Sequence, residues 1–266
     1  MVKIDGDLVV RLEATAAQLG ASVAGRMVAA GVPGASPAEA FCGGALIVLG
    51  PGRYLNRAVG IGSAAVSADE ADRLEAYFRG HGSHPAIEVS SWASPSLIEV
   101  VAGRAYRPAW FRNIYARLLV PATDGGGTEV EIRQVDDELV GPWLDVLADG
   151  NGFSNPSDRS ISDEFATARY AMPEGTNYLA FVDGRPAGCG SLEIAAGVGW
   201  VGGAATIEAF RGRGVQTALL RHRLQLAAAK GCDIAAASSL PTGTSARNLG
   251  RSGFSLAFTH VVMTRP

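Results

Sequence analysis

The chain has 266 residues and a formal net charge of −3 at pH 7, so it can build one large or two modest domains. Hydrophobic residues make up 47% and charged residues 18%, which excludes a largely disordered chain. The slightly acidic balance gives no support for a nucleic-acid-binding surface.

The cysteines and the apolar runs indicate the compartment. Cys42, Cys189 and Cys232 are odd in number and widely spaced, which suits a reducing environment better than a disulfide framework. The N-terminus has no basic-then-apolar signal pattern, and no apolar run reaches membrane-spanning length. We therefore expect a cytoplasmic protein with neither a membrane nor a nucleic-acid partner.

The N-terminal half shows an α/β pattern. Within residues 62–71 a helix is expected to begin, which Ser67 caps in the ordinary way and which has Asp69 and Glu70 at its start. Residues 86–91 predict a strand, which is followed by a loop containing Pro95, a helix, and an apolar closing strand.

The natural boundary in the chain is the segment Pro121-Ala122-Thr123-Asp124-Gly125-Gly126-Gly127. A polar, glycine-rich stretch between two strand-like segments is typical of a linker. It predicts two domains, at residues 1–122 and 128–266.

After this linker the elements alternate in a regular order. Residues 128–135 predict a strand and residues 137–147 and 162–172 predict helices. An antiparallel run follows over residues 178–182, 186–194 and 198–207, with turns at Asp183-Gly184 and Ala196-Gly197. Residues 215–230 then predict an amphipathic helix, and residues 233–238, 245–251 and 255–264 predict strand, helix and strand.

Between the strand and the long helix lies Arg211-Gly212-Arg213-Gly214-Val215-Gln216. A glycine-bearing turn before a helix presents several backbone N–H groups in one direction, and the helix dipole adds positive potential. Arg211 and Arg213 in the turn, and Arg221 and Arg223 along the helix, are expected to add cationic charge. We interpret this turn as a cradle for a diphosphate.

Two other phosphate-binding motifs fit poorly. A Walker A loop needs a Gly-Lys pair, and the chain contains none. A Rossmann fingerprint needs a small residue where Thr217 stands and an acidic residue at the end of the next strand. That strand instead has Asp233 at its start and serines at its end.

The loop and the closing segment Ser245-Ala246-Arg247-Asn248-Leu249-Gly250-Arg251-Ser252-Gly253-Phe254 together resemble the GNAT superfamily of N-acetyltransferases. The resemblance covers roughly 140 residues, the size of one ordinary domain. It implies a fold of the α/β (α+β) class, with two GNAT-like domains, each a mixed and mostly antiparallel sheet flanked by helices.

The resemblance also implies acetyl-CoA as co-substrate and assigns residues to it. Backbone groups of Ala204, Ala205 and Thr206 would pair with the pantetheine arm. The diphosphate and the final motif would involve Arg211, Gly212, Arg213, Gly214, Val215, Gln216, Thr217 and Asn248.

The N-terminal half looks like a degenerate copy of the C-terminal half, and the competing interpretation is that any two α/β segments share such an order of elements. Ile87 corresponds to Ile234 and Gly103 to Gly250 at the same sequence offset. Where the copy should carry the cradle it has Asp69 and Glu70, which would repel phosphate. We expect a single cofactor site, in the C-terminal half, with the N-terminal half shaping the substrate side.

Amine acetylation also needs a base for the amine and a donor or hydrogen bond for the leaving thiolate. Glu193 is the candidate base. Side chains alternate along a strand, so Glu193 lies on the face opposite Leu192 and Ile194, where it is either exposed or in the cleft. Many superfamily members place a tyrosine where this chain has Leu249, which has no proton to give. Ser238 is the candidate for bonding the thiolate, and strand-end capping is the competing interpretation.

Other polar and aromatic residues are weaker candidates. His222 lies on the face that should pack on the sheet and is interpreted as a core residue. His81 and His84 have metal-compatible spacing but lack Cys or acidic partners, so no metal is expected. Tyr170, Trp200 and Trp143 could line an acceptor pocket, although core packing explains each of them.

The sequence therefore predicts an N-acetyltransferase that moves an acetyl group from acetyl-CoA to a primary amine by direct attack in a ternary complex. A non-catalytic acyl-CoA sensor or scaffold is the first alternative, favoured by Leu249. A nucleotide-binding oxidoreductase is the second alternative, and against it stands the missing carboxylate that would bind the ribose of the nucleotide. The acceptor and the acyl chain length stay open, and so does the assembly, for which a homodimer is one candidate.

Overall fold

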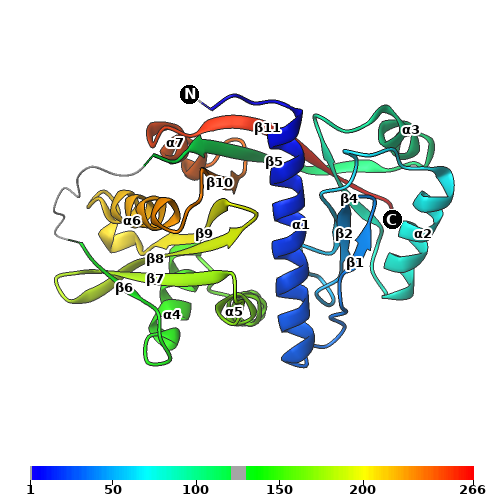
Figure 1. The fold of residues 1–266 in the computed structure, drawn as a ribbon. Helices are drawn as coiled ribbons and strands as arrows, with labels where there is room; N and C mark the ends of the chain where they lie inside the picture. The colour runs from blue at the N-terminus through cyan, green and yellow to red at the C-terminus, as the bar shows by residue number, and fades with distance from the viewer. Residues whose placement is uncertain (1, 121–129) are drawn as a thin grey trace. The chain divides into compact units, whose positions relative to one another are not determined.

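The structure is a computed structural model that describes residues 2–120 and 130–266. The linker expected at residues 121–127 lies outside these ranges. Figure 1 shows the described elements along the chain. The helices are α1 (Gly6–Ala29), α2 (Ala68–Gly80), α3 (Pro95–Gly103), α4 (Val140–Asn151), α5 (Pro156–Tyr170), the short 3-10 helix η1 (Glu208–Phe210), α6 (Val215–Ala229) and α7 (Thr244–Arg251). The strands are β1 (Glu39–Phe41), β2 (Gly44–Ile47), β3 (Arg57–Val59), β4 (Ala86–Ser90), β5 (Arg107–Leu118), β6 (Glu131–Gln134), β7 (Gly175–Val182), β8 (Arg185–Ala195), β9 (Val198–Thr206), β10 (Ile234–Ser239) and β11 (Ser255–Thr264).

The chain divides into two compact units, residues 1–116 with 238–266, and residues 117–237. In the first unit the hydrogen-bonded strand order is β1-β2-β3-β4-β11-β5, and in the second it is β10-β9-β8-β7-β6. Most neighbours are antiparallel, but β3 runs parallel to β4 and β9 runs parallel to β10. This confirms the predicted mixed α+β class.

The last strand departs from a simple two-domain arrangement. β11 comes from the predicted C-terminal domain, yet it pairs antiparallel with both β4 and β5 of the N-terminal residues. It therefore lies between two strands of the N-terminal half. Two separate domains are therefore not shown, and the predicted boundaries stay a prediction.

In the second unit, tight turns and glycines build the antiparallel run. Asp183 and Ala196 adopt positive φ values of 52° and 50°, as two-residue hairpin turns between right-twisted strands require. Both predicted turns are thereby confirmed. α6 packs on one face of the sheet so closely that a Cβ at Gly188 would lie 2.6 Å from Val215. α4 packs on the other face, where a Cβ at Gly150 would lie 2.7 Å from Ala205 (Figure 1).

In the first unit, helices also cover both faces of the sheet. α2 and α3 cover an apolar core of buried side chains that includes Leu74, Phe78 and Ile87. On the opposite face, α1 lies directly on the strands: a Cβ at Gly60 would stand 2.6 Å from the carbonyl oxygen of Glu13. The left-handed backbone of Gly60, with φ 71°, and this close approach both require glycine.

The face under α1 carries buried charges beside its apolar contacts. The guanidinium of Arg57 lies 2.8 Å from Glu88, and both side chains are fully buried. Arg112 reaches the same Glu88 oxygen at 3.4 Å, while Glu13 of α1 lies 2.7 Å from Nε2 of His260 on β11. Burial alone would raise the pKa of Glu88, but the guanidinium groups of Arg112 and Arg57 lower it to about 2. Glu88 is therefore the anion that pairs with the fully buried Arg57 and the partly exposed Arg112.

The substitution Glu88→Gln should lower the free energy of unfolding by about 3–5 kcal/mol, because it leaves the fully buried Arg57 without its counter-charge and removes the partner of Arg112. Because the folded pKa of Glu88 is depressed, its stabilisation is present above about pH 4.5 and is lost as the pH falls towards about 2. Urea unfolding at several pH values measures both effects. The control is Glu99→Gln on α3, at an exposed position. Equal losses in the two variants would contradict a special role for Glu88.

Candidate functional site

Strand β9 contains a bulge next to the predicted cofactor residues. Cys189 pairs with Ala205 and Ser191 pairs with Gly202, so that Gly190 of β8 faces both Gly203 and Ala204. Gly203 adopts a φ of 54°, a left-handed value suited to glycine. A bulge interrupts the regular ladder and turns backbone groups away from it. The backbone of β9 is thus irregular where the sequence predicts contact with the pantetheine arm.

The loop after β9 opens α6 without a side-chain cap. Gly212 and Gly214 have φ values of 80° and 77°, and Gly214 is the N-cap residue of α6. Among the described residues no side chain caps this helix, and the first intrahelical bond runs from the N–H of Ala218 to the carbonyl of Gly214. N–H groups in the first turn of a helix have no intrahelical partner. The turn therefore presents backbone donors and the positive end of the helix dipole.

The loop is open to an incoming anion. Residues 211–214 are exposed, and a Cβ at Gly212 or Gly214 would meet nothing within 4 Å. Arg213 lies 2.9 Å from Asp183 and stacks over the ring of Phe210. This loop fits a diphosphate, because it offers backbone donors at a helix N-terminus together with two exposed arginines.

Arg223 does not join this loop, contrary to the sequence-based expectation. It is buried, and its Nη1 donates to the carbonyl oxygens of Ser191 and Gly202, each at 3.1 Å. Burial lowers its pKa to about 10, so it stays cationic at neutral pH. The helical period explains the difference, since Arg223 lies two turns beyond the buried Val215, on the sheet-facing side.

Glycine makes room for this buried cation. A Cβ at Gly190 would lie 2.6 Å from the central guanidinium carbon of Arg223. The guanidinium therefore lies directly against β8, opposite the bulge of β9. We conclude that Arg223 holds β8 and β9 together beside the bulge and does not bind phosphate.

The candidate base Glu193 is paired with a cation. Its carboxylate accepts a charge-assisted hydrogen bond from Arg169 of α5, and the Glu193 side chain is only 4% exposed. A Cβ at Gly203 would lie 3.0 Å from the same guanidinium, so the pair lies against the bulge. The other carboxylate oxygen of Glu193, Oε2, is buried and has no hydrogen-bond partner among the described residues. The role of Glu193 as a base stays a prediction.

The remaining predicted residues lie in other elements. Ser238 is half-buried near the end of β10, and Asn248 is half-buried in α7. Leu249, also in α7, is buried. In the second unit, burial raises the pKa of the Cys189 thiol to about 12, which makes it a poor nucleophile.

The weaker candidates behave mostly as packing residues. The ring of His222 contacts the edge of Tyr178 with centroids 4.8 Å apart, and burial lowers its pKa. Trp143 is buried, and Tyr170 donates to Asp137 at 2.9 Å. Within the described residues no group of three or more His, Cys, Asp and Glu side chains could hold a metal. No helix in the described part of the chain is both long and apolar enough to cross a bilayer.

Comparison with known proteins bears on this site. Residues 145–254 match the model of the acetyltransferase (GNAT) family. This segment is a GNAT acetyltransferase sequence. It contains the bulged strand, the glycine loop and α6, and members of this family typically depend on acetyl-CoA. A search of the curated proteins found no match.

Solved structures show a similar fold. A GCN5-related N-acetyltransferase from Kribbella flavida is 19% identical with a TM-score of 0.61, covering 80% of this chain and 82% of that one. A functionally unknown conserved protein from Staphylococcus epidermidis is 12% identical, with a TM-score of 0.58 and coverages of 83% and 90%. A tandem GNAT protein from the clavulanic acid biosynthesis pathway is 13% identical, with a TM-score of 0.57 and coverages of 84% and 73%. At these identities the likeness establishes the GNAT fold alone.

Sequence reasoning missed two features of the site. The Gly202-Gly203 pair inside a strand was a usable signal for the bulge, since glycine in a strand interior often marks one. The Arg169–Glu193 pair had no local signal, because its members lie 24 residues apart on a helix and a strand.

Arg223→Met should destabilise the second unit by at least about 2 kcal/mol, because the carbonyls of Ser191 and Gly202 would lose a buried charged donor. Chemical unfolding monitored by circular dichroism measures this. The control is Arg221→Met on the same helix, at a half-buried position, for which we expect a change within about 0.5 kcal/mol. If the two variants were equally stable, the structural role of Arg223 would be refuted.

Proposed function

We propose that this protein is an acetyl-CoA-dependent N-acetyltransferase that transfers an acetyl group to a primary amine by direct attack in a ternary complex. One observation carries the proposal: the uncapped N-terminus of α6, framed by Gly212 and Gly214, follows a bulged strand in a segment of GNAT sequence. Backbone donors at this position suit the phosphate oxygens of a nucleotide-linked thioester.

Each group in the loop has a separate task in this proposal. The N–H groups of Val215, Gln216 and Thr217 would bind the diphosphate, with Arg211 and Arg213 adding positive charge. The backbone of Ala204, Ala205 and Thr206 on β9 would align the pantetheine arm, with Asn248 of the final motif contributing to the cofactor site. When bound, acetyl-CoA supplies the activated acyl group as a thioester.

The proton transfers would fall to side chains of this chain. Glu193 is the proposed base, and Arg169 would hold its carboxylate in place while Oε2 receives the proton of the amine. Ser238 is proposed to donate a hydrogen bond to the departing thiolate. A covalent acyl-enzyme on Cys189 is disfavoured, because burial keeps that thiol protonated.

A sensor that binds acyl-CoA without turnover is the second candidate. Leu249 favours it, since this buried hydrocarbon side chain stands where many members of the superfamily have a tyrosine. Turnover separates the candidates: an enzyme releases free CoA thiol when amines are added, whereas a sensor binds acetyl-CoA and releases none.

Gly214→Glu should weaken acetyl-CoA binding at least tenfold, which corresponds to about 1.4 kcal/mol. The substitution places a negative side chain where the diphosphate should lie and strains a residue with φ 77°. Isothermal titration calorimetry measures the dissociation constant.

The matched control is Gly231→Glu, just past the other end of α6. Gly231 also has a positive φ, of 83°, and open space around it, so the control carries the same strain and charge. We expect the control to bind acetyl-CoA as the native protein does. Equal weakening in both variants, or no binding by the native protein, would overturn the cofactor assignment.

A further inference from the structure

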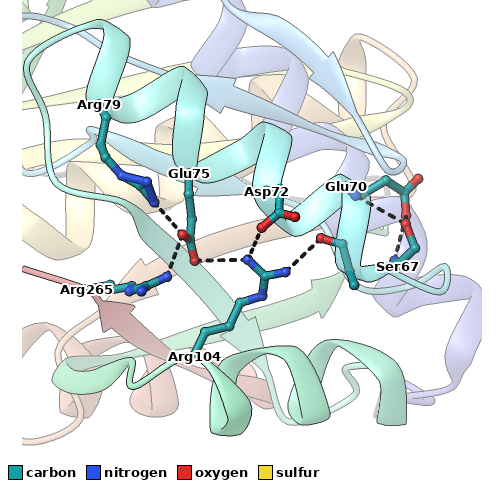
Figure 2. A network of polar contacts seen from close by, with 8 residues as sticks. Ser67, Glu70, Asp72, Glu75, Arg79, Arg104 and Arg265 are labelled. Carbon is teal, nitrogen blue, oxygen red and sulfur yellow. Dashed lines mark hydrogen bonds and ion pairs between the residues drawn. The ribbon is translucent and has the colours of Figure 1, made fainter.

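The first unit contains a second cluster of arginines, far along the sequence from the glycine loop. Glu75 of α2 is only 3% exposed, and its carboxylate accepts hydrogen bonds from Arg79 on the same helix and from Arg265 after β11, the latter at 2.5 Å. Arg104 lies 3.6 Å from Glu75 and pairs with Asp72 at 2.5 Å. Figure 2 shows the three arginines converging on this helix face.

Among the side chains of the cluster, cations outnumber anions. Three guanidinium groups share the buried carboxylate of Glu75 and the exposed one of Asp72. Burial alone would raise the pKa of Glu75, but hydrogen bonds from Arg79 and Arg265 lower it, so Glu75 stays ionised and keeps both side chains in place. Arg79 and Arg265 are still 55% and 37% exposed.

An open cavity of about 450 Å³ lies beside these two arginines. Its lining residues are Arg79, Gly82, Ser83, His84, Pro85, Arg265 and Pro266. Backbone hydrogen bonds hold its walls in place. The N–H of Ser83 donates to the carbonyl oxygen of Phe78 at 2.9 Å, and the N–H of Arg265 donates to the carbonyl oxygen of Pro85 at 2.9 Å. The volume lies in the range of small-molecule sites.

We propose that this cavity binds a small oxyanion, a molecule that carries a phosphate or carboxylate group. A guanidinium has five N–H donors, and the bonds to Glu75 occupy one nitrogen of Arg79 and one of Arg265. The other donors can bind oxygen atoms in a planar, charge-assisted geometry. The hydroxyl of Ser83 and the ring of His84 add polar groups to the wall. This site is independent of the acetyl-CoA site proposed above.

The test measures binding of inorganic pyrophosphate and of citrate by calorimetry at low ionic strength. Because pyrophosphate could also occupy the loop at Gly214, each titration is repeated in the Gly214→Glu background. We expect one site to persist in that background, Arg79→Gln to weaken it at least tenfold, and Arg79→Lys to weaken it less. The probe with the lower dissociation constant identifies phosphate or carboxylate as the preferred group.

The matched control is Arg73→Gln on the same helix, whose side chain is 64% exposed and pairs with Glu39 outside the cavity. It should bind both anions unchanged. Ser83→Glu provides a second variant, which adds a negative charge to the wall without removing an arginine, and it should also weaken binding at least tenfold. Binding that vanishes with Gly214→Glu, or that is equal in Arg79→Gln and Arg73→Gln, would overturn the proposal.

Discussion

The left-handed backbone of Gly214 at the start of α6 is the constraint from which the candidate site follows. With φ 77° at the N-cap, the chain turns from β9 into the helix without a side chain that could satisfy the first-turn donors. An ordinary N-cap such as Ser67 of α2 accepts a hydrogen bond from one of these donors, the N–H of Glu70, and its capping box with Glu70 adds a carboxylate at the helix start. The two helix starts therefore differ in charge and in free backbone donors, although the halves of the chain resemble each other in element order.

Buried cations are the second recurring device in this protein. In the second unit Arg223 bonds the carbonyls of adjacent strands beside the bulge, and glycines at positions 190 and 202 accommodate arginine side chains. In the first unit Arg57 and Arg112 share the buried Glu88 under α1. Each arrangement costs desolvation, which the opposing charge of Glu88 offsets in the first unit and the carbonyl acceptors offset in the second. The buried arginines hold neighbouring strands together. Arg211 and Arg213, by contrast, are the exposed cations of the glycine loop.

Much of the local structure could be predicted from the sequence, because hydrophobic period and turn chemistry determine it. The turn residues Asp183 and Ala196, the start of α6 at Val215 and the full extent of β11 followed from these rules. The place of β11 beside β4 did not follow, because strand pairing depends on contacts between segments far apart in the sequence. Arg223 was misassigned for a related reason: its charge suggested the loop, whereas the helical period placed it against the sheet. The Arg169–Glu193 pair and the buried charges under α1 arise only from tertiary packing and have no local sequence signal.

The central claim is that backbone amides at the start of α6 bind the diphosphate of acetyl-CoA. Hydrogen–deuterium exchange with and without acetyl-CoA tests it most directly, because exchange reports on the amides themselves. The account predicts slower exchange for amides within residues 211–217 and unchanged exchange within residues 62–71, where the N-terminal half has the capping box instead. Unchanged exchange across residues 211–217 at saturating acetyl-CoA, or equal protection of residues 62–71, would contradict it.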